Sequence, residues 1–204
     1  MYWWCERGEK LFSFSLYSIF LRKKEGTLIM ETNPPNLNLK MTAIEKLLNV
    51  LGILSYSGVI VYIIFTWDAI PNQIPGHYNE AGEVTRWGGR EELFILLGIG
   101  LLLWFGMTVM ERFPHVYNYR NLTEANVKGQ YINSRMLVNV LKNEIAILFP
   151  FIIWNDIRVA RGLPSYINTW SLVFIILLFA GTIAFFIKKM RENSLFKRVE
   201  VRGR

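Results

Sequence analysis

Cysteine and histidine are scarce in this 204-residue sequence, which has one cysteine and two histidines. The lone Cys5 cannot form a disulfide within the chain, and there is no Cys-x-x-Cys pair, no H-E-x-x-H motif, no P-loop and no G-x-S-x-G nucleophile elbow. Metal, redox, nucleotide and acyl-transfer chemistry usually depend on these patterns. We therefore expect a protein that is not an enzyme, with no catalytic residue, no metal site and no cofactor.

Charged residues are also few, at 19% of the chain, while 52% of the residues are hydrophobic. The apolar residues gather in runs long enough to cross a bilayer, which a water-soluble core does not require. This composition excludes disordered, collagen-like and small disulfide-stapled proteins. The net charge of +7 would suggest nucleic-acid binding in a soluble domain. In a membrane protein the basic residues indicate topology instead, so we expect no nucleic-acid partner.

The first 29 residues differ from the rest of the chain. Their apolar run, residues 11–21, is too short to span a bilayer, and its basic residues follow it, whereas those of a signal peptide precede the run. The codons AAA-AAG-GAG-GGN for residues 23–26 would contain a bacterial ribosome-binding sequence shortly before Met30. We therefore expect translation to start at Met30 and residues 1–29 to be a non-native extension. A poorly ordered cytosolic extension is the alternative.

Four apolar segments predict an all-α integral membrane protein with four transmembrane helices. The third segment is the least regular, because uninterrupted apolar sequence covers only residues 145–154 and a crossing must extend back through polar residues. A re-entrant third segment is the alternative. The predicted spans are residues 47–67, 93–110, 137–157 and 170–187.

Lysine and arginine predict the orientation of these spans, because positively charged loops are retained in the cytosol. The connections 68–92 and 158–169 contain two each, whereas segment 111–136 contains four and the tail 188–204 contains seven. We therefore expect a multi-pass protein of the cytoplasmic cell membrane with both termini in the cytosol. Tryptophans suited to the interface lie at the predicted outer ends of three spans, at Trp67, Trp154 and Trp170. The predicted parts of the chain are the extension 1–29, a cytosolic N-terminus at 30–46, a motif-bearing membrane domain at 47–157, the fourth span at 170–187 and a basic cytosolic tail at 188–204.

The predicted outer loop, residues 68–92, is rich in residues that restrict the backbone. Pro71 and Pro75 favour an extended strip, residues 79–82 have the composition of a turn, and Gly88 with Gly89 suggests a second bend. We expect this ordered loop of 25 residues to fold onto the helix ends. Its expected apolar anchors are Ile70, Ile74, Tyr78 and Trp87.

Two motifs in and beyond this loop resemble a known family. The first consists of Pro71, Ile74, Pro75, His77, Asn79, Gly82, Trp87, Gly88 and Arg90. The second consists of Asn118, Tyr119, Thr123, Asn126, Gln130 and Tyr131. Together they resemble a bacterial multi-pass membrane family classed as a domain of unknown function, which also forms the N-terminal part of SdpI-like immunity proteins against a sporulation-delay toxin. The resemblance implies that the first motif is a recognition loop. The chain departs from the family pattern at Val84 and Thr85, where relatives usually have Pro-Asp.

Polar residues inside the predicted spans form a second candidate site, made of Asn49, Asn139, Lys142 and Glu144. The long side chain of Lys142 can extend to the interface, and Glu144 is expected to meet Asn49 or water. The two histidines lie on opposite sides of the membrane in the predicted topology, so they cannot share a metal ion. For His77 we expect a hydrogen bond to the loop backbone, with an oxygen-rich ion site as the alternative.

Two functions fit these features. The first is a non-enzymatic membrane protein whose outer loop takes part in recognition, immunity or signal relay at the cell envelope, with a peptide toxin or an envelope component as partner beside the lipid bilayer. The alternative is a small oligomeric transporter or channel subunit with a polar path near Glu144. A homo-oligomer is expected for that alternative, because four helices leave little room for a pore.

Overall fold

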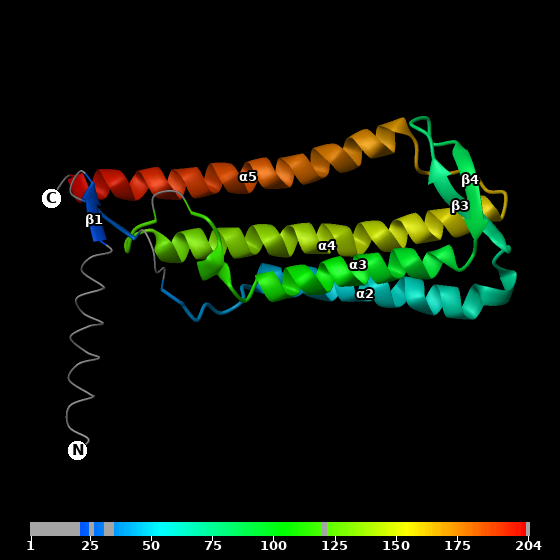
Figure 1. Ribbon diagram of the computed structural model, residues 1–204, viewed down its shortest axis with the longest axis horizontal. Coiled ribbons are helices and arrows are strands. Elements are labelled where there is room, and N and C mark those ends of the chain that lie inside the picture. Colours follow the sequence, from blue (N-terminus) through cyan, green and yellow to red (C-terminus); the bar gives the residue numbers. More distant parts are fainter. Residues whose placement is uncertain (1–20, 25–26, 31–34, 120–121, 203–204) are drawn as a thin grey trace, which may run out of the picture. The chain divides into compact units, whose positions relative to one another are not determined.

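The computed structural model describes residues 21–24, 27–30, 35–119 and 122–202 (Figure 1). Side chains are described for residues 35–119 and 122–193. Cys5 and most of the expected non-native extension, residues 1–29, lie outside the described residues. Two short strands, β1 (Leu21–Lys24) and β2 (Thr27–Met30), pair antiparallel at the end of that segment.

Four long helices dominate the described chain: α2 (Ala43–Thr66), α3 (Glu92–Met110), α4 (Val127–Ala160) and α5 (Thr169–Arg202). Each is long and apolar enough to cross a membrane, which confirms the expected number of candidate spans. Helix α4 is continuous through residues 137–157 and begins earlier than that range. A re-entrant third segment is therefore not what the structure shows.

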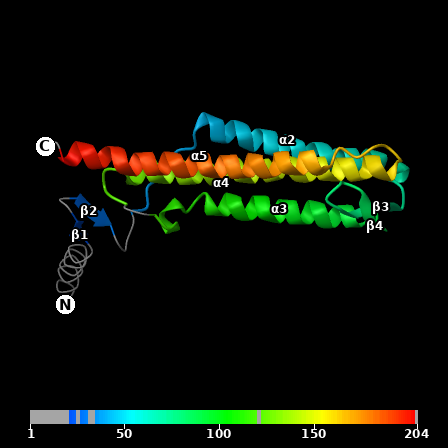
Figure 2. The same cartoon turned by 90° about the horizontal axis from the view of Figure 1, so that it is seen from above.

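Two compact units divide the chain. One unit, which we call the bundle unit, contains residues 40–112 and 136–185. Within it, α2, α3 and α4 run alongside one another, and a hairpin lies at one end of these helices (Figures 1 and 2). The other unit contains the described parts of residues 1–39, 113–135 and 186–204, including the short helix η2 (Pro114–Val116).

The helix starts follow from local side-chain chemistry. Thr42 precedes α2, and its hydroxyl accepts from the Glu45 N–H at 3.3 Å while the Glu45 carboxylate accepts from the Thr42 N–H at 2.6 Å. This reciprocal capping box satisfies two backbone donors that a helix leaves unpaired. Thr123 and Asn126 form the same reciprocal pair before α4, at 3.3 Å and 2.8 Å, so an asparagine serves where a glutamate is usual.

The core of the bundle unit is small and lies between α2, α3 and α4. It includes Tyr56 and Ile63 of α2, Leu97 of α3 and Ile153 of α4. Many large apolar side chains of α2, α3 and α5 are exposed, including Ile64 at 66% and Leu102 at 70%. An exposed apolar surface of this extent suits helices surrounded by lipid.

The connection between α2 and α3 is a β-hairpin. After the short helix η1 (Trp67–Ala69), strand β3 (Gln73–Tyr78) pairs antiparallel with β4 (Val84–Gly89), and the register is irregular at His77. The extended strip predicted after Pro71 is therefore strand β3, and it is paired with β4 along its length. Gly88 and Gly89 lie within β4, so the second bend expected there was wrong.

Three of the four expected apolar anchors hold the hairpin. Ile70 and Ile74 are 3% and 0% exposed, and both belong to the bundle core. Tyr78 is half-buried. Trp87 is 48% exposed, so its assignment as an anchor was wrong.

Candidate functional site

The tip of the hairpin is a tight turn closed by Asn79. The Asn79 carbonyl accepts from the Gly82 N–H at 3.0 Å, and its side chain bonds both the N–H and the carboxylate of Glu83, at 2.9 Å and 2.8 Å. Gly82 has a φ of 84°, which is the left-handed region that favours glycine. The turn expected at residues 79–82 is present, and Asn79 organises it.

The hairpin is fastened to the end of α4 through Tyr78. The Tyr78 hydroxyl donates to the Asp156 carboxylate at 2.6 Å and accepts from the Asn155 amide at 3.3 Å. Asp156 is only 2% exposed, so this charge-assisted bond is shielded from water. Burial, and then the neighbouring carboxylate, raise the pKa of Tyr78 far above its ordinary value, which keeps the phenol protonated as the donor.

Further contacts fix the hairpin on its two other sides. The Thr169 hydroxyl at the start of α5 donates to the Glu80 carbonyl at 2.8 Å. On the opposite side, the Arg86 guanidinium makes two parallel bonds of 2.8 Å to the carboxylate of Glu92, the first residue of α3. Arg86 also donates to the Gly76 carbonyl at 2.9 Å, which joins the two strands. The hairpin is therefore attached to three helices of the bundle unit.

The other motif residues of the hairpin divide into a supporting group and an exposed group. Ile74 and Pro75 are buried, Pro71 and Gly88 are half-buried, and Arg90 lies over the Trp67 ring at 4.5 Å. His77 and Trp87 are exposed.

His77 belongs to the exposed group, and its ring nitrogen Nδ1 lies 2.7 Å from the Thr85 hydroxyl. We expected the His77 ring to bond the loop backbone. The ring instead contacts the side chain of Thr85 on the neighbouring strand β4. Among the described residues there is no group of three His, Cys, Asp or Glu side chains placed to hold a metal ion.

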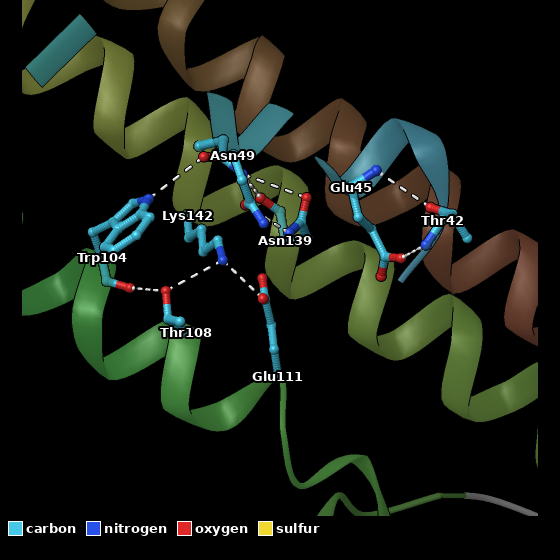
Figure 3. A network of polar contacts seen from close by, with 9 residues as sticks. Thr42, Glu45, Asn49, Trp104, Thr108, Glu111, Asn139 and Lys142 are labelled. Atoms are coloured by element: carbon cyan, nitrogen blue, oxygen red, sulfur yellow. Dashed lines mark hydrogen bonds and ion pairs between the residues drawn. The ribbon is translucent and has the colours of Figure 1, made fainter. Parts of the chain in front are cut away.

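A buried polar cluster lies inside the bundle unit, between α2, α3 and α4 (Figure 3). The Asn49 side-chain carbonyl accepts from the amides of Asn139 and Asn143, at 3.0 Å each. A Cβ at Gly52 would overlap the Asn143 side chain, so a larger residue there would displace Asn143 from this contact. The contact of Asn49 with Asn139 brings together two of the residues expected to form the intramembrane site.

Lys142 forms an ion pair at the centre of this cluster. Its ammonium lies 2.7 Å from the Glu111 carboxylate and 3.2 Å from the Thr108 hydroxyl, and 5.1 Å from the centre of the Trp104 ring (Figure 3). The side chains of Lys142 and Glu111 are 1% and 7% exposed. A carboxylate just after α3 and a hydroxyl on α3 satisfy the ammonium inside the protein. The extension of Lys142 to the interface stays a prediction.

Glu144 does not join this cluster. Its carboxylate accepts from the Thr182 hydroxyl of α5 at 2.6 Å, so the expected contact with Asn49 was wrong. Glu144 follows Lys142 by two residues, and positions two apart on a helix point to different sides. One carboxylate oxygen of Glu144 is buried without a hydrogen-bond partner.

The second motif builds the core of the other unit. Tyr131 is fully buried and lies 5.3 Å from the Tyr119 ring, whose hydroxyl bonds the Ser134 hydroxyl at 2.6 Å. The Gln130 amide donates to the Met190 carbonyl of α5 at 2.9 Å. Asn118 is exposed. These contacts, with the cap formed by Thr123 and Asn126, give the motif a structural role.

Several residues of both sites cannot be recognised from the sequence. Asp156 and Glu111 occupy the ends of apolar runs, where charged residues ordinarily mark the point at which a span stops. The available signal was the adjacent pair Asn155 and Asp156, two polar residues before the predicted third span ends. The sequence predicts Tyr78 as an apolar anchor and does not indicate a partner for its hydroxyl.

Comparison with known proteins gives a match to a protein family. A family model for a domain of unknown function (DUF1648) matches residues 58–101. No curated protein and no solved structure matches the chain. The matched segment contains the end of α2, the whole hairpin and the first half of α3. The segment that is similar to this family therefore has the docked hairpin at its centre.

Proposed function

We propose that the protein is a non-enzymatic membrane protein that recognises a partner at the cell envelope through the exposed face of its hairpin. The carrying observation is the buried bond between Tyr78 and Asp156, which fastens a surface loop to a membrane-crossing helix. A loop held rigidly on a scaffold loses little conformational entropy on binding, which favours affinity. The exposed side chains of His77 and Trp87 supply a polar and an aromatic contact of the kind that recognition sites use.

The partner class that we propose is a peptide toxin or an envelope component, with immunity or signal relay as the consequence. Helix α4 supports a relay, because it carries both Asp156 and Lys142 on one continuous segment. These residues are about 21 Å apart along the helix at its usual rise. A partner that tilted the hairpin would thus pull on the helix that also holds the ion pair with α3.

Recognition at the cell surface requires the hairpin to lie outside the cytosol, as the distribution of basic residues favours. We expect a cysteine that replaces Trp87 in a Cys5→Ala background to react with a membrane-impermeant maleimide on intact cells. A cysteine at Met41, before α2 and 40% exposed, is the matched control and should react only after permeabilisation. The reverse pattern would place both termini outside and end the proposal.

The alternative is a transporter or channel subunit, and one observation favours it. A buried carboxylate oxygen of Glu144 lacks a hydrogen-bond partner, and such a group within a span is a candidate ion or proton site. Against a continuous path, Glu144 lies apart from the cluster of Asn49, Asn139 and Lys142, where side-chain bonds join three helices.

Two variants separate these functions. The double variant His77→Ala/Trp87→Ala changes exposed side chains, so it should alter unfolding free energy by less than about 1 kcal/mol. It should abolish protection of expressing cells against the membrane-active peptides that their own species secretes. Glu144→Gln should leave protection unchanged and would stop proton flux in proteoliposomes if the protein were a transporter. The transporter would be the better assignment if His77→Ala/Trp87→Ala kept full protection and if Glu144→Gln abolished a proton flux shown by the wild type.

A further inference from the structure

An apolar groove of about 440 Å³ runs between α2 and α4 in the bundle unit. Leu54, Gly58 and Tyr62 line it from α2, and Ile147, Pro150 and Trp154 line it from α4. The lining residues extend over nine positions of α2, from residue 54 to residue 62, which is about 12 Å at helical rise. The groove therefore follows the helices for more than two turns, and it lies in segments apolar enough to be surrounded by lipid.

One end of this groove carries positive charge. Arg161, just after α4, donates to the Tyr62 hydroxyl at 3.1 Å and is exposed. Arg158 lies 5.0 Å from the centre of the Trp154 ring, and its Nε is buried without a hydrogen-bond partner. Among the described side chains, neither arginine is paired with a carboxylate. Two guanidinium groups without a carboxylate partner thus lie beside the apolar groove, at the end where Tyr62 and Trp154 line it.

We propose that this groove binds one acyl chain of an anionic phospholipid, whose phosphate lies against the guanidinium of Arg161. The apolar lining matches the chain, and arginine is well suited to phosphate because its planar fork donates two hydrogen bonds at once. Tyr62 and Trp154 suit the boundary between hydrocarbon and headgroups. The site requires only that α2 and α4 cross a membrane, so it is independent of what the hairpin recognises.

Gly58 allows a direct test, because a Cβ at this position meets no atom within 4 Å. Gly58→Leu should therefore fill the groove without disturbing the packing of α2 on α4. Gly98→Leu on α3 is the matched control, since Gly98 also has nothing within 4 Å and lies outside the groove. Arg161→Gln removes the charge at an exposed position.

Native mass spectrometry of the purified full chain, titrated with dioleoyl phosphatidylglycerol or dioleoyl phosphatidylcholine, measures the outcome. We expect the wild type to prefer the anionic lipid by about fivefold, the preference that one basic group near an anionic headgroup gives. Arg161→Gln should remove the preference, Gly58→Leu should lose bound lipid of both kinds, and Gly98→Leu should behave as the wild type.

Three results would overturn the proposal. Unchanged lipid binding by Gly58→Leu would show that the groove is not the site. An unchanged preference in Arg161→Gln would remove the phosphate contact. A wild-type dimer that Gly58→Leu converts to a monomer, with lipid binding unaffected, would show that the groove holds a second copy of the chain.

Discussion

Replacing Lys142 with methionine should lower the unfolding free energy by about 3–5 kcal/mol, because it leaves the Glu111 carboxylate buried without its partner. The two side chains are 1% and 7% exposed, so water cannot replace the ammonium without rearrangement. Methionine has nearly the same shape as the lysine stem, so little of this loss comes from packing. The measurement is reversible unfolding of the full chain in mixed micelles.

Two further variants isolate the unpaired charge as the cause. Lys46 is an exposed lysine on α2, and Lys46→Met should change stability by less than about 0.5 kcal/mol. The double variant Lys142→Met/Glu111→Leu removes both charges and should recover most of the loss, since apolar replacements of a buried pair are often neutral or stabilising. A double variant as unstable as Lys142→Met would mean that packing, not charge, dominates.

The loss in Lys142→Met should also depend on pH. Burial raises the pKa of Glu111, and the hydrogen bond and charge of Lys142 oppose that rise. Without Lys142 the folded protein should take up a proton at Glu111 more readily than the unfolded chain does. A group whose pKa is higher in the folded protein than in the unfolded chain stabilises the fold at a pH below the unfolded pKa. This stabilisation is lost as the pH rises through the pKa of the folded protein. The deficit of Lys142→Met should therefore shrink on acidification. The double variant lacks the Glu111 carboxyl, so its own stability should show no pH dependence from this position.

The four helices that are long and apolar enough to cross a membrane could be predicted from the sequence, because the bilayer imposes one simple requirement. A segment in lipid must satisfy its own backbone hydrogen bonds, so length and hydropathy are enough to locate it. Helix α4 was the hardest case, since Asn139 and Lys142 interrupt its apolar sequence. Their partners Asn49 and Glu111 lie on other helices, and hydropathy does not show which side chains meet across a bundle.

The hairpin was predictable only where its chemistry is local. The turn at Asn79 follows from four adjacent residues, and the burial of Ile74 follows from the need to cover the helix ends. The contact between Tyr78 and Asp156 joins residues 78 positions apart, and only the folded chain brings them together. Hydrophobicity alone predicts Trp87 to be an anchor. Because the register is irregular at His77, the alternation of side chains along the strands does not show that Trp87 is exposed.

Replacing Gly82 with alanine should cost about 3 kcal/mol and release the hairpin from the bundle. Part of this cost is backbone strain, because a φ of 84° places a Cβ in the disfavoured left-handed region, at roughly 1–2 kcal/mol. The remainder is a steric clash. A Cβ at residue 82 would overlap the Ile167 carbonyl oxygen and lie 2.9 Å from the Asn168 Cα, and both belong to backbone that cannot rotate away.

Gly162 separates the two causes, since its φ of 78° is nearly the same but a Cβ there meets nothing within 4 Å. Gly162→Ala should therefore show the strain alone, roughly 1–2 kcal/mol, with the hairpin still docked. Hydrogen exchange distinguishes the outcomes: the amides of β3 and β4 should lose protection in Gly82→Ala and keep it in Gly162→Ala. Equal stability losses with equal protection would mean that the tip of the hairpin does not press on the segment before α5. The turn would then be fixed only by its own hydrogen bonds, and Tyr78 alone would hold the hairpin to α4.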